Sequence, residues 1–581
     1  MLSELAREAG IADSYTDYFG REKIVSRETK RAILAAMGLS AGSERQAMRL
    51  ARDLRAAKAR AARSAPKASA AFIPPRADNV WGYSLQLYSL RSSRNWGIGD
   101  FGDLARFVQT ARECGADLVG INPLHQLYLT NPTSASPYSP LSRLQLNALY
   151  IDVDTAWRKL LGREAPVSSA ALQAVRDTEF VDYAAVADLK VPALRALYGE
   201  WNASQHGGSA EFERFRTAAG TTLRETAIYE ALNAYFKERN ADAYGWMQWP
   251  AEFANPNSSA VARFAGGHAH EVRFYEFLQW VADEQLAAAS HAAQGMAIGL
   301  YRDLAVGVDA NGADVWRDRA AYSLALSVGA PPDALNTQGQ NWGLPPLNPH
   351  VLRERRYAPF VSVLRANMRH AGALRIDHVM GLQRLYLIPH GAPASDGAYV
   401  QYPLEALVGL LAAESRANHC LIVGEDLGTV PPGFRERMAQ ARVLSCRLLY
   451  FEDPRGFPQD AVASTGTHDL PPLLGEWPSL PPAKQQTLCE WAQTPAPADG
   501  GDCAFVTSTY RALAHSPARV VLVQMEDALL QREAVNVPGT TTEQPNWRRK
   551  LPVAVEALQG DVCFATLAGA VSEARPRKEE R

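Results

Sequence analysis

The 581-residue chain lacks both a large excess of one charge and a long hydrophobic run. Its 60 Lys and Arg residues are balanced by 62 Asp and Glu residues, for a formal net charge of -2. No global field therefore attracts nucleic acid or an anionic membrane. No run approaches the roughly 18 apolar residues of a membrane helix. The start, MLSELAREAGIADSYTDYFG, also lacks the apolar core of a signal peptide. We expect a soluble, cytoplasmic protein that acts on a neutral or small ligand, without nucleic-acid or membrane partners.

Cysteine is scarce and scattered. The six cysteines form no CxxC pair and show no zinc-like spacing; they are Cys114, Cys420, Cys446, Cys489, Cys503 and Cys563. This distribution favours reduced thiols in a cytoplasm over a disulfide scaffold.

The first part of the chain has a helical pattern. Residues 1 to about 55 are rich in Ala, Leu, Arg and Glu at helical spacing, as in SRETKRAILAAMGL. Ser26 is placed to act as an N-cap, and Glu28 falls in the first turn of that helix. The sequence predicts a small N-terminal helical segment.

A change in composition separates this segment from the rest of the chain. Residues 56–77, AAKARAARSAPKASAAFIPPRA, are low in complexity and end near Pro74 and Pro75, which is typical of a linker. We expect a linker over 56–79 and a single large domain over 80–581.

Eight short apolar runs follow, separated by segments of helical pattern. They are LQLYSL (85–90), LVGINPLH (118–125), AIGLYRDL (297–304), ALRIDHV (373–379), CLIVGEDLG (420–428), RLLYFED (447–453), AVASTGTHD (461–469) and VVLVQMEDAL (520–529). This alternation predicts an α/β fold, a (β/α)8 TIM barrel. The connection from about 126 to 296 is too long for one βα unit, and we interpret it as an inserted subdomain that could wall a cleft.

Several of the predicted strands end in acidic residues. Asp303 ends the third run, Asp377 the fourth, Glu425 the fifth and Asp469 the seventh. Because the C-terminal ends of barrel strands open onto one face, these carboxyl groups should converge, and like charges there raise at least one pKa. The ALRIDHVMGL segment by itself fits either a structural ion pair or a functional site.

A divalent metal held by oxygen ligands is the alternative explanation for this acidic cluster. A catalytic zinc site usually has clustered histidines, and the His-x-His pair of His268 and His270 lies in a loop-like GGHAHE that is more typical of a surface. No phosphate loop or dinucleotide fingerprint occurs. We expect neither a metal nor an organic cofactor.

Aromatic residues in Gly- and Pro-rich loops indicate sugar chemistry. Examples are NWGIGD (95–100), SPYSP (136–140), QNWGLPP (340–346) and PNWRRKL (545–551). Aromatic faces in loops can stack on pyranose rings. Glycoside cleavage also needs one carboxylate at the anomeric carbon and one protonated carboxyl at the leaving oxygen.

The motifs together resemble the 4-alpha-glucanotransferases of the amylomaltase or disproportionating-enzyme type, family 77 of the glycoside hydrolases and relatives of the alpha-amylase clan. The matching segments run in family order from about 83 to 551. They are YSLRSSRNWGIGDFGDL, INPLHQLYLTNPTSASPYSPLSR, IGLYRDLAVGV, VGAPPDALNTQGQNWGLPP, GALRIDHVMGL, VGEDLGTVP, TGTHDLP and NVPGTTTEQPNWRRKL. The N-terminal segment also resembles extensions of bacterial members.

The resemblance implies residue roles. Asp377 corresponds to the nucleophile, Glu425 to the general acid/base and Asp469 to the transition-state stabiliser. The implied substrate-binding residues are Tyr138, Asp303, Trp342, Arg375, His378, His468 and Asn536.

Two further expectations concern strand geometry. Arg375 lies two residues before Asp377 on the same side of a strand, so its charge should keep that carboxylate ionised. Asp426, next to Glu425, should point away from the cleft and be structural.

The implied reaction is a retaining double displacement. It transfers alpha-1,4-glucan segments from a donor maltooligosaccharide to the 4-hydroxyl of an acceptor glucan or of glucose. Two alternatives remain open: an alpha-glucan hydrolase with the same three carboxylates, and a catalytically silent glucan-binding protein. The sequence does not specify the oligomeric state.

Overall fold

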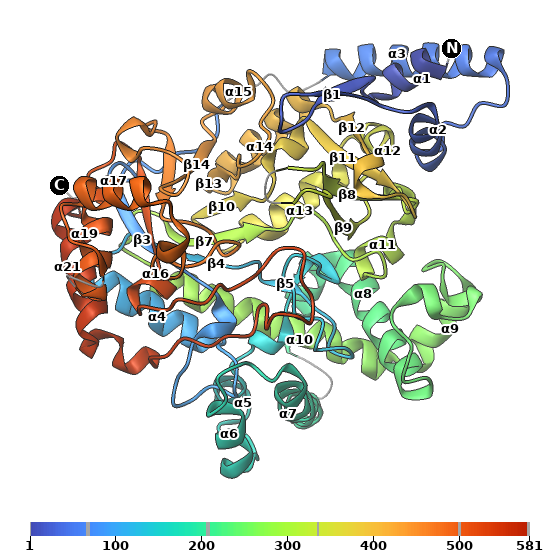
Figure 1. Ribbon diagram of the computed structural model, residues 1–581. Helices are drawn as coiled ribbons and strands as arrows, with labels where there is room; N and C mark the ends of the chain where they lie inside the picture. Colours follow the sequence, from blue (N-terminus) through green and yellow to red (C-terminus); the bar gives the residue numbers. More distant parts are fainter. Residues whose placement is uncertain (1, 65–69, 205–208, 334–335, 498–500, 578–581) are drawn as a thin grey trace.

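The core of the molecule is a closed barrel of eight parallel strands (Figure 1). The computed structural model describes residues 2–64, 70–204, 209–333, 336–497 and 501–577. The barrel strands follow the chain order, and the last pairs with the first: β3 (Val80–Leu85), β4 (Leu118–Ile121), β7 (Gly299–Leu304), β10 (Ala373–Ile376), β13 (Leu421–Gly424), β14 (Leu444–Leu448), β15 (Ala461–Ser464) and β16 (Val520–Gln524). The predicted (β/α)8 fold is confirmed.

Two of the eight predicted strands are displaced along the chain. The first barrel strand ends at Leu85, and Leu87–Ser89 form a 3-10 turn, so the run 85–90 is a loop rather than a strand. Every residue of that run is buried, which explains its apolar character, because burial alone does not distinguish a strand from a packed loop. The strand β14 ends at Leu448, where the run 447–453 is only beginning.

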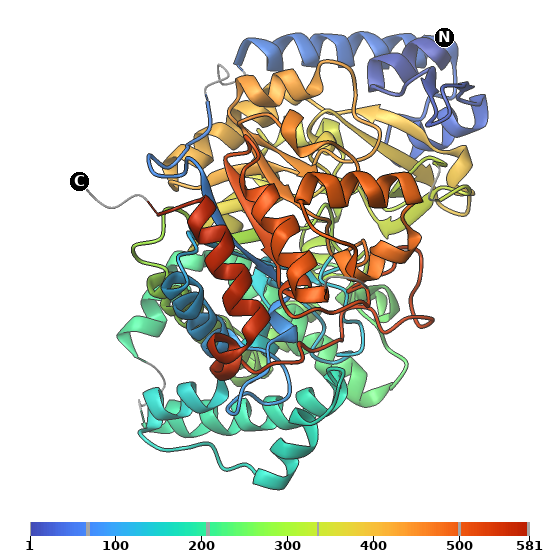
Figure 2. The same ribbon diagram turned by 60° about the vertical axis from the view of Figure 1, so that its left-hand side comes forward.

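Helices surround the barrel (Figures 1 and 2). Apart from the first five helices of the long β4–β7 connection, the described helices between or after the barrel strands are α4 (Phe101–Glu113), α10 (Ala269–Ala292), α11 (Ala313–Arg317), α12 (Pro349–Glu354), α13 (Ala358–Met368), α14 (Leu404–Ala417), α15 (Phe434–Gln440), α16 (Leu473–Glu476), α17 (Pro482–Ala492), α19 (Asp502–Ala514), α20 (Met525–Ala528) and α21 (Val562–Ala574). Asp100 caps α4 by accepting hydrogen bonds from the backbone N–H groups of Gly102 and Asp103. None of the helices in the described ranges combines the length and the apolar character that crossing a bilayer requires.

The connection that we propose as an inserted subdomain lies between β4 and β7. It contains the short pair β5 (His125–Gln126) and β6 (Ser142–Leu146), followed by α5 (Val153–Leu161), α6 (Ser169–Arg176), α7 (Tyr183–Ser204), α8 (Ala210–Arg239), α9 (Ser259–Gly267) and α10. Both views place α5, α6 and α7 at the end of the molecule opposite the N-terminal helices.

A second, antiparallel sheet flanks the barrel. Its strand order is β12 (Ala398–Gln401), β11 (Arg384–Pro389), β8 (Leu326–Ala330) and β9 (Gln340–Leu344). The N-terminal segment consists of α1 (Leu2–Ala9), β1 (Ser14–Thr16), β2 (Glu22–Ile24), α2 (Arg27–Ala36) and α3 (Glu44–Ser64), and it packs against this sheet through α2 on β11 and β1 on β12. The hydroxyl groups of Tyr15 and Tyr386, for example, lie 3.2 Å apart. The predicted N-cap is confirmed, since the Ser26 hydroxyl accepts a hydrogen bond from Thr29 N.

The predicted linker is partly helical. Helix α3 continues to Ser64, past the expected boundary at residue 55. The physical reason is that Ala, Lys and Arg, which make this stretch low in complexity, are also strong helix formers. Residues 65–69 of the predicted linker lie outside the described residues. Beyond them, Ala71 N donates a hydrogen bond to Ala441 O at 2.7 Å, which ties this segment to the barrel.

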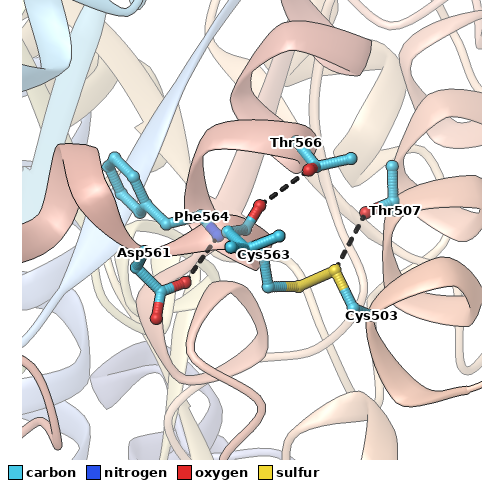
Figure 3. Close-up of a disulfide and its surroundings, with 7 residues drawn as sticks. Cys503, Thr507, Asp561, Cys563, Phe564 and Thr566 are labelled. Carbon is cyan, nitrogen blue, oxygen red and sulfur yellow. Dashed lines mark hydrogen bonds between the residues drawn. A yellow bond between two sulfur atoms is a disulfide. The ribbon is translucent and has the colours of Figure 1, made fainter.

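A disulfide joins two C-terminal helices (Figure 3). Cys503 of α19 is bonded to Cys563 of α21, 60 residues away in the sequence, with Cα atoms 5.5 Å apart. The expectation of reduced thiols is therefore wrong for these two cysteines. Their spacing carries no pairing signal, because only the packing of α19 against α21 brings them together.

Candidate active site

Two carboxylates on neighbouring strands share one arginine. Asp377 directly follows β10, and its backbone N donates to Leu304 O at 3.1 Å. Arg375 Nη1 lies 2.9 Å from Asp377 Oδ1 and 2.8 Å from Asp303 Oδ2. Because Arg375 is directly opposite Asp303 in the register of β10 and β7, the barrel itself sets this arrangement. The guanidinium thereby fixes the orientation of both carboxyl groups.

Glu425 follows the next strand, β13, and is held by backbone donors. Its Oε2 accepts from His378 N at 2.9 Å, and its Oε1 accepts from Leu427 N at 2.7 Å. The chain turns sharply after Asp377, where His378 adopts a left-handed φ of 47°. This turn brings the backbone next to Asp377 against the Glu425 side chain.

Asp469, after β15, is held by a histidine and an amide. His468 Nε2 lies 3.3 Å from Asp469 Oδ2. Asn536 Nδ2 donates to Asp469 Oδ1 at 2.6 Å, and Asn536 N donates to His468 O at 3.1 Å. The loop that carries Asn536 is therefore bound to the loop after β15 through both its side chain and its backbone.

The environments of Asp377 and Glu425 favour their protonated forms. Burial raises the pKa of Asp377 to about 6, Arg375 opposes this rise, and Asp303 and Glu425 add to it. Burial likewise raises the pKa of Glu425, against the charge of Arg375 and the two backbone hydrogen bonds. The prediction that Arg375 favours ionised Asp377 is correct in sign, but burial outweighs it.

The environment of Asp469, in contrast, favours its ionised form. Burial acts to raise the pKa of this carboxyl, but the charge and hydrogen bond of His468 and the hydrogen bond of Asn536 lower it to about 2. For His468, burial acts to lower the pKa, but the charge and the hydrogen bond of Asp469, with the charge of Asp303, together give a net rise. Asp469 therefore remains an anion at every pH at which the protein is expected to work.

Aromatic rings line the same region. Tyr138 Oη donates to Asp303 Oδ2 at 2.7 Å, and the Tyr138 ring stacks on His468 with centroids 4.9 Å apart. Trp547 contacts both rings, at 5.4 Å from Tyr138 and 5.3 Å from His468. Sequence reasoning did not assign Trp547 to the site, although it lies within the PNWRRKL motif that drew attention to this loop.

Trp342 reaches the site from the second sheet. Its ring, on β9, contacts His378 edge to face with centroids 5.3 Å apart. Burial lowers the pKa of His378 and so favours a neutral imidazole there. All ten predicted site residues thus lie at the barrel mouth, with Trp342 joined to the others through His378.

A hollow of about 780 Å³ opens at these strand ends. Its lining includes Asp303, Arg375, Glu425 and His468, together with Gln86 and Glu526. Sequence reasoning missed the last two. Glu526 lies just past the end of β16, so the rule that found the other acids, a polar residue at the end of a barrel strand, also applies to it.

Other charged residues singled out from the sequence have different roles. Asp426 is buried, pairs with Arg435 at 2.7 Å and accepts from Cys446 N at 3.0 Å, as expected for a structural residue. His268 stacks on Phe264 in the inserted segment. In the described part of the chain, no group of three His, Cys, Asp or Glu side chains is arranged to hold a metal ion.

Comparison with known proteins gives consistent matches. Residues 85–555 match the family model described as 4-alpha-glucanotransferase. The 4-alpha-glucanotransferase of Haemophilus influenzae is 38% identical over 545 residues, which cover 83% of this chain and 77% of that protein. The corresponding protein of Mycobacterium tuberculosis is 36% identical over 554 residues, covering 85% of this chain and 75% of the relative.

Two solved structures have a fold similar to that of this chain. The amylomaltase of Corynebacterium glutamicum has a TM-score of 0.79 at 25% sequence identity, covering 98% of this chain and 99% of that one. The amylomaltase of Streptococcus agalactiae, solved in complex with acarbose, has a TM-score of 0.74 at 19% identity, covering 86% of this chain and 100% of its own, and supports the fold.

Proposed function

Because the chain belongs to the 4-alpha-glucanotransferase family and is a glycosyl-transferring enzyme of that kind, we propose that Asp377, Glu425 and Asp469 carry out its reaction. The observation that carries this proposal is the difference between their surroundings. The pKa values of Asp377 and Glu425 are raised, while the pKa of Asp469 is lowered to about 2. One site can thus hold a nucleophile, a proton donor and a permanent anion.

In the first step, Glu425 donates its proton to the glycosidic oxygen while Asp377 attacks the anomeric carbon. The bond from that carbon to the leaving oxygen breaks, and an ester bond to the carboxylate of Asp377 forms. With a pKa of about 6, Asp377 is mainly ionised at neutral pH, as a nucleophile must be. Arg375, 2.9 Å away, orients the attacking carboxylate.

In the second step, Glu425 accepts the proton from the 4-hydroxyl of the acceptor, whose oxygen displaces Asp377. The two inversions together retain the alpha configuration. The N–H groups of His378 and Leu427 stabilise the ionised form of Glu425 in which it acts as a base.

Asp469 stabilises the positive charge that develops on the sugar in both transition states. Its charge is already present before the reaction, because His468 and Asn536 hold it, so no proton has to move to create it. The partly exposed ring of Tyr138 offers an aromatic face on which a pyranose ring can stack, and the buried Trp547 packs against it.

We propose alpha-1,4-glucans and maltooligosaccharides as the substrates, in starch, glycogen or maltodextrin metabolism. The Streptococcus agalactiae amylomaltase of similar fold was solved with acarbose. A cytoplasmic location also stays a proposal. The disulfide between Cys503 and Cys563 is of a kind more common in oxidising compartments, so cell fractionation is the test of that point.

Incubation with maltotriose alone, followed by separation of the products by size, tests the proposed roles. The wild-type protein should give a ladder of longer maltooligosaccharides with released glucose, and the Asp377→Asn variant should give none. Glucose and maltose without longer products would instead mean that water is the acceptor. An active Asp377→Asn variant would contradict the assignment of the nucleophile.

A further inference from the structure

Glu526 is a buried acid at the same barrel mouth to which the proposed mechanism gives no role. It lies in α20, directly after β16, and its side chain lines the hollow that also contains Glu425 and His468. The residue is only 5% exposed. A carboxyl group in such a place is costly unless something satisfies its hydrogen-bonding capacity.

The neighbouring Asp527 shows what a structural acid looks like here. Its Oδ2 accepts from Tyr510 Oη at 2.6 Å and from Thr465 Oγ1 at 2.8 Å, and its Oδ1 accepts from Leu473 N at 2.6 Å. Glu526 differs, because within the described ranges no other residue donates a hydrogen bond to its carboxyl group. A role in fold stability explains why the Asp527 carboxyl group is buried. It does not explain the burial of the Glu526 carboxyl group.

A second unsatisfied group lines the same hollow. In the register of β16 and β3, Gln524 is opposite Ser84, and two residues further along each chain come Glu526 and Gln86. Both residues line the hollow. Gln86 is 6% exposed, and its Oε1 is buried without a hydrogen-bond partner.

Glu526 can hold its proton near neutral pH, and a neutral carboxyl group suits a neutral ligand. Burial raises the pKa of this carboxyl to about 7, with the charge of Asp527 adding to the rise and that of His468 opposing it. A neutral carboxyl can donate one hydrogen bond and accept others, while Gln86 Oε1 needs a donor. A sugar hydroxyl both donates and accepts, so a single hydroxyl can satisfy both residues.

We propose that Glu526 and Gln86 bind a hydroxyl group of the glucose residue held in the hollow, and so help to select the sugar that reacts. This inference rests on the proposed function, which places a glucose residue among Asp377, Glu425 and Asp469. It adds a polar contact from the β16 and β3 side of the barrel, opposite the contacts from Arg375 and Asp303.

The test measures binding without turnover. In the full-length Asp377→Asn protein, calorimetry gives the dissociation constants of maltotriose and of maltotrioses that each lack one hydroxyl. Adding Glu526→Leu should weaken maltotriose binding on the order of 10- to 100-fold. For the analogue that lacks the contacted hydroxyl, the loss should fall to within about threefold, since the two deletions remove the same hydrogen bond.

Two further variants distinguish the loss of a sugar contact from misfolding. Glu526→Gln keeps the shape and can still donate and accept, so it should bind maltotriose more tightly than Glu526→Leu. Glu533→Gln removes an exposed acid from the same stretch of chain and should leave every dissociation constant unchanged. An equal loss for all analogues, or no loss for any, would overturn the proposal. Failure of the proposed function would appear separately, as a wild-type protein that makes no ladder from maltotriose.

Discussion

Arg375 Nη1 lies within hydrogen-bonding distance of both Asp377 and Asp303, at 2.9 Å and 2.8 Å, so one guanidinium joins the proposed nucleophile to a neighbouring acid. Its side chain is 14% exposed, and solvent screens these contacts little. Because burial raises the pKa of Asp377 and Arg375 opposes that rise, the arginine keeps the nucleophile ionised near neutral pH.

Replacement of this arginine should therefore act through protonation. In Arg375→Gln, the pKa of Asp377 should rise further, and kcat/KM for maltotriose should fall more at pH 6 than at pH 8. Arg375→Lys keeps a charge and should show a smaller shift of the same sign. The measurement is the full pH profile of kcat/KM for both variants, and an acid limb that does not move in Arg375→Gln would refute this role.

The pH dependence of kcat/KM in the wild-type protein should reflect the ionisation of Asp377. The nucleophile must be ionised, and it is ionised above its pKa, so kcat/KM should fall as the pH drops through about 6. Asp469, with its pKa of about 2, should add no limb in the accessible range. Initial transfer rates from pH 4 to pH 9 check this, and a midpoint near the ordinary pKa of aspartate, about 4, would be inconsistent with a buried Asp377.

Asn536 should matter for rate more than for binding. Its amide donates a 2.6 Å hydrogen bond to Asp469, whose charge is proposed to stabilise the transition state. Loss of a hydrogen bond to a charged group at a partly exposed position should reduce kcat about tenfold in Asn536→Ala, with a smaller change in KM. Steady-state kinetics separate the two parameters. Asn546→Ala, in the same loop, serves as a control for loop disorder, because Asn546 bonds to Thr540 rather than to the carboxylate.

The disulfide should contribute to stability. Closing a loop of about 60 residues lowers the entropy of the unfolded chain, which corresponds to about 4 kcal/mol in the chain-entropy model. The Cys503→Ser/Cys563→Ser variant should therefore unfold at a lower urea concentration than the wild type under non-reducing conditions, and dithiothreitol should remove the difference. Cys114→Ser, which breaks no disulfide, is the control. Peptide mapping that recovers Cys503 and Cys563 unlinked would show the bond to be absent.

Many features of the fold could be read from the sequence, within limits that have physical causes. The alternation of apolar runs and helical patterns predicted the barrel, because strands covered on both faces by helices must be apolar throughout. The same criterion misplaced two strands, since the fully buried loop at Leu87–Ser89 is equally apolar. The C-terminal part of helix α3 has the composition of a linker, because the residues that make it low in complexity are also strong helix formers.

The acidic residues at the strand ends were determined by the sequence alone. Asp377 and Glu425 directly follow parallel strands and Asp469 lies in the loop just after another, and closure of a barrel brings the ends of its strands together. Local order along the chain is sufficient for that inference. The tertiary structure decided the contacts between residues far apart in the sequence, namely Asn536 with Asp469, Trp547 with Tyr138, and Cys503 with Cys563, and it placed Glu526 and Gln86 at one hollow. These contacts depend on how loops and helices pack across the barrel, and no short-range pattern encodes that packing.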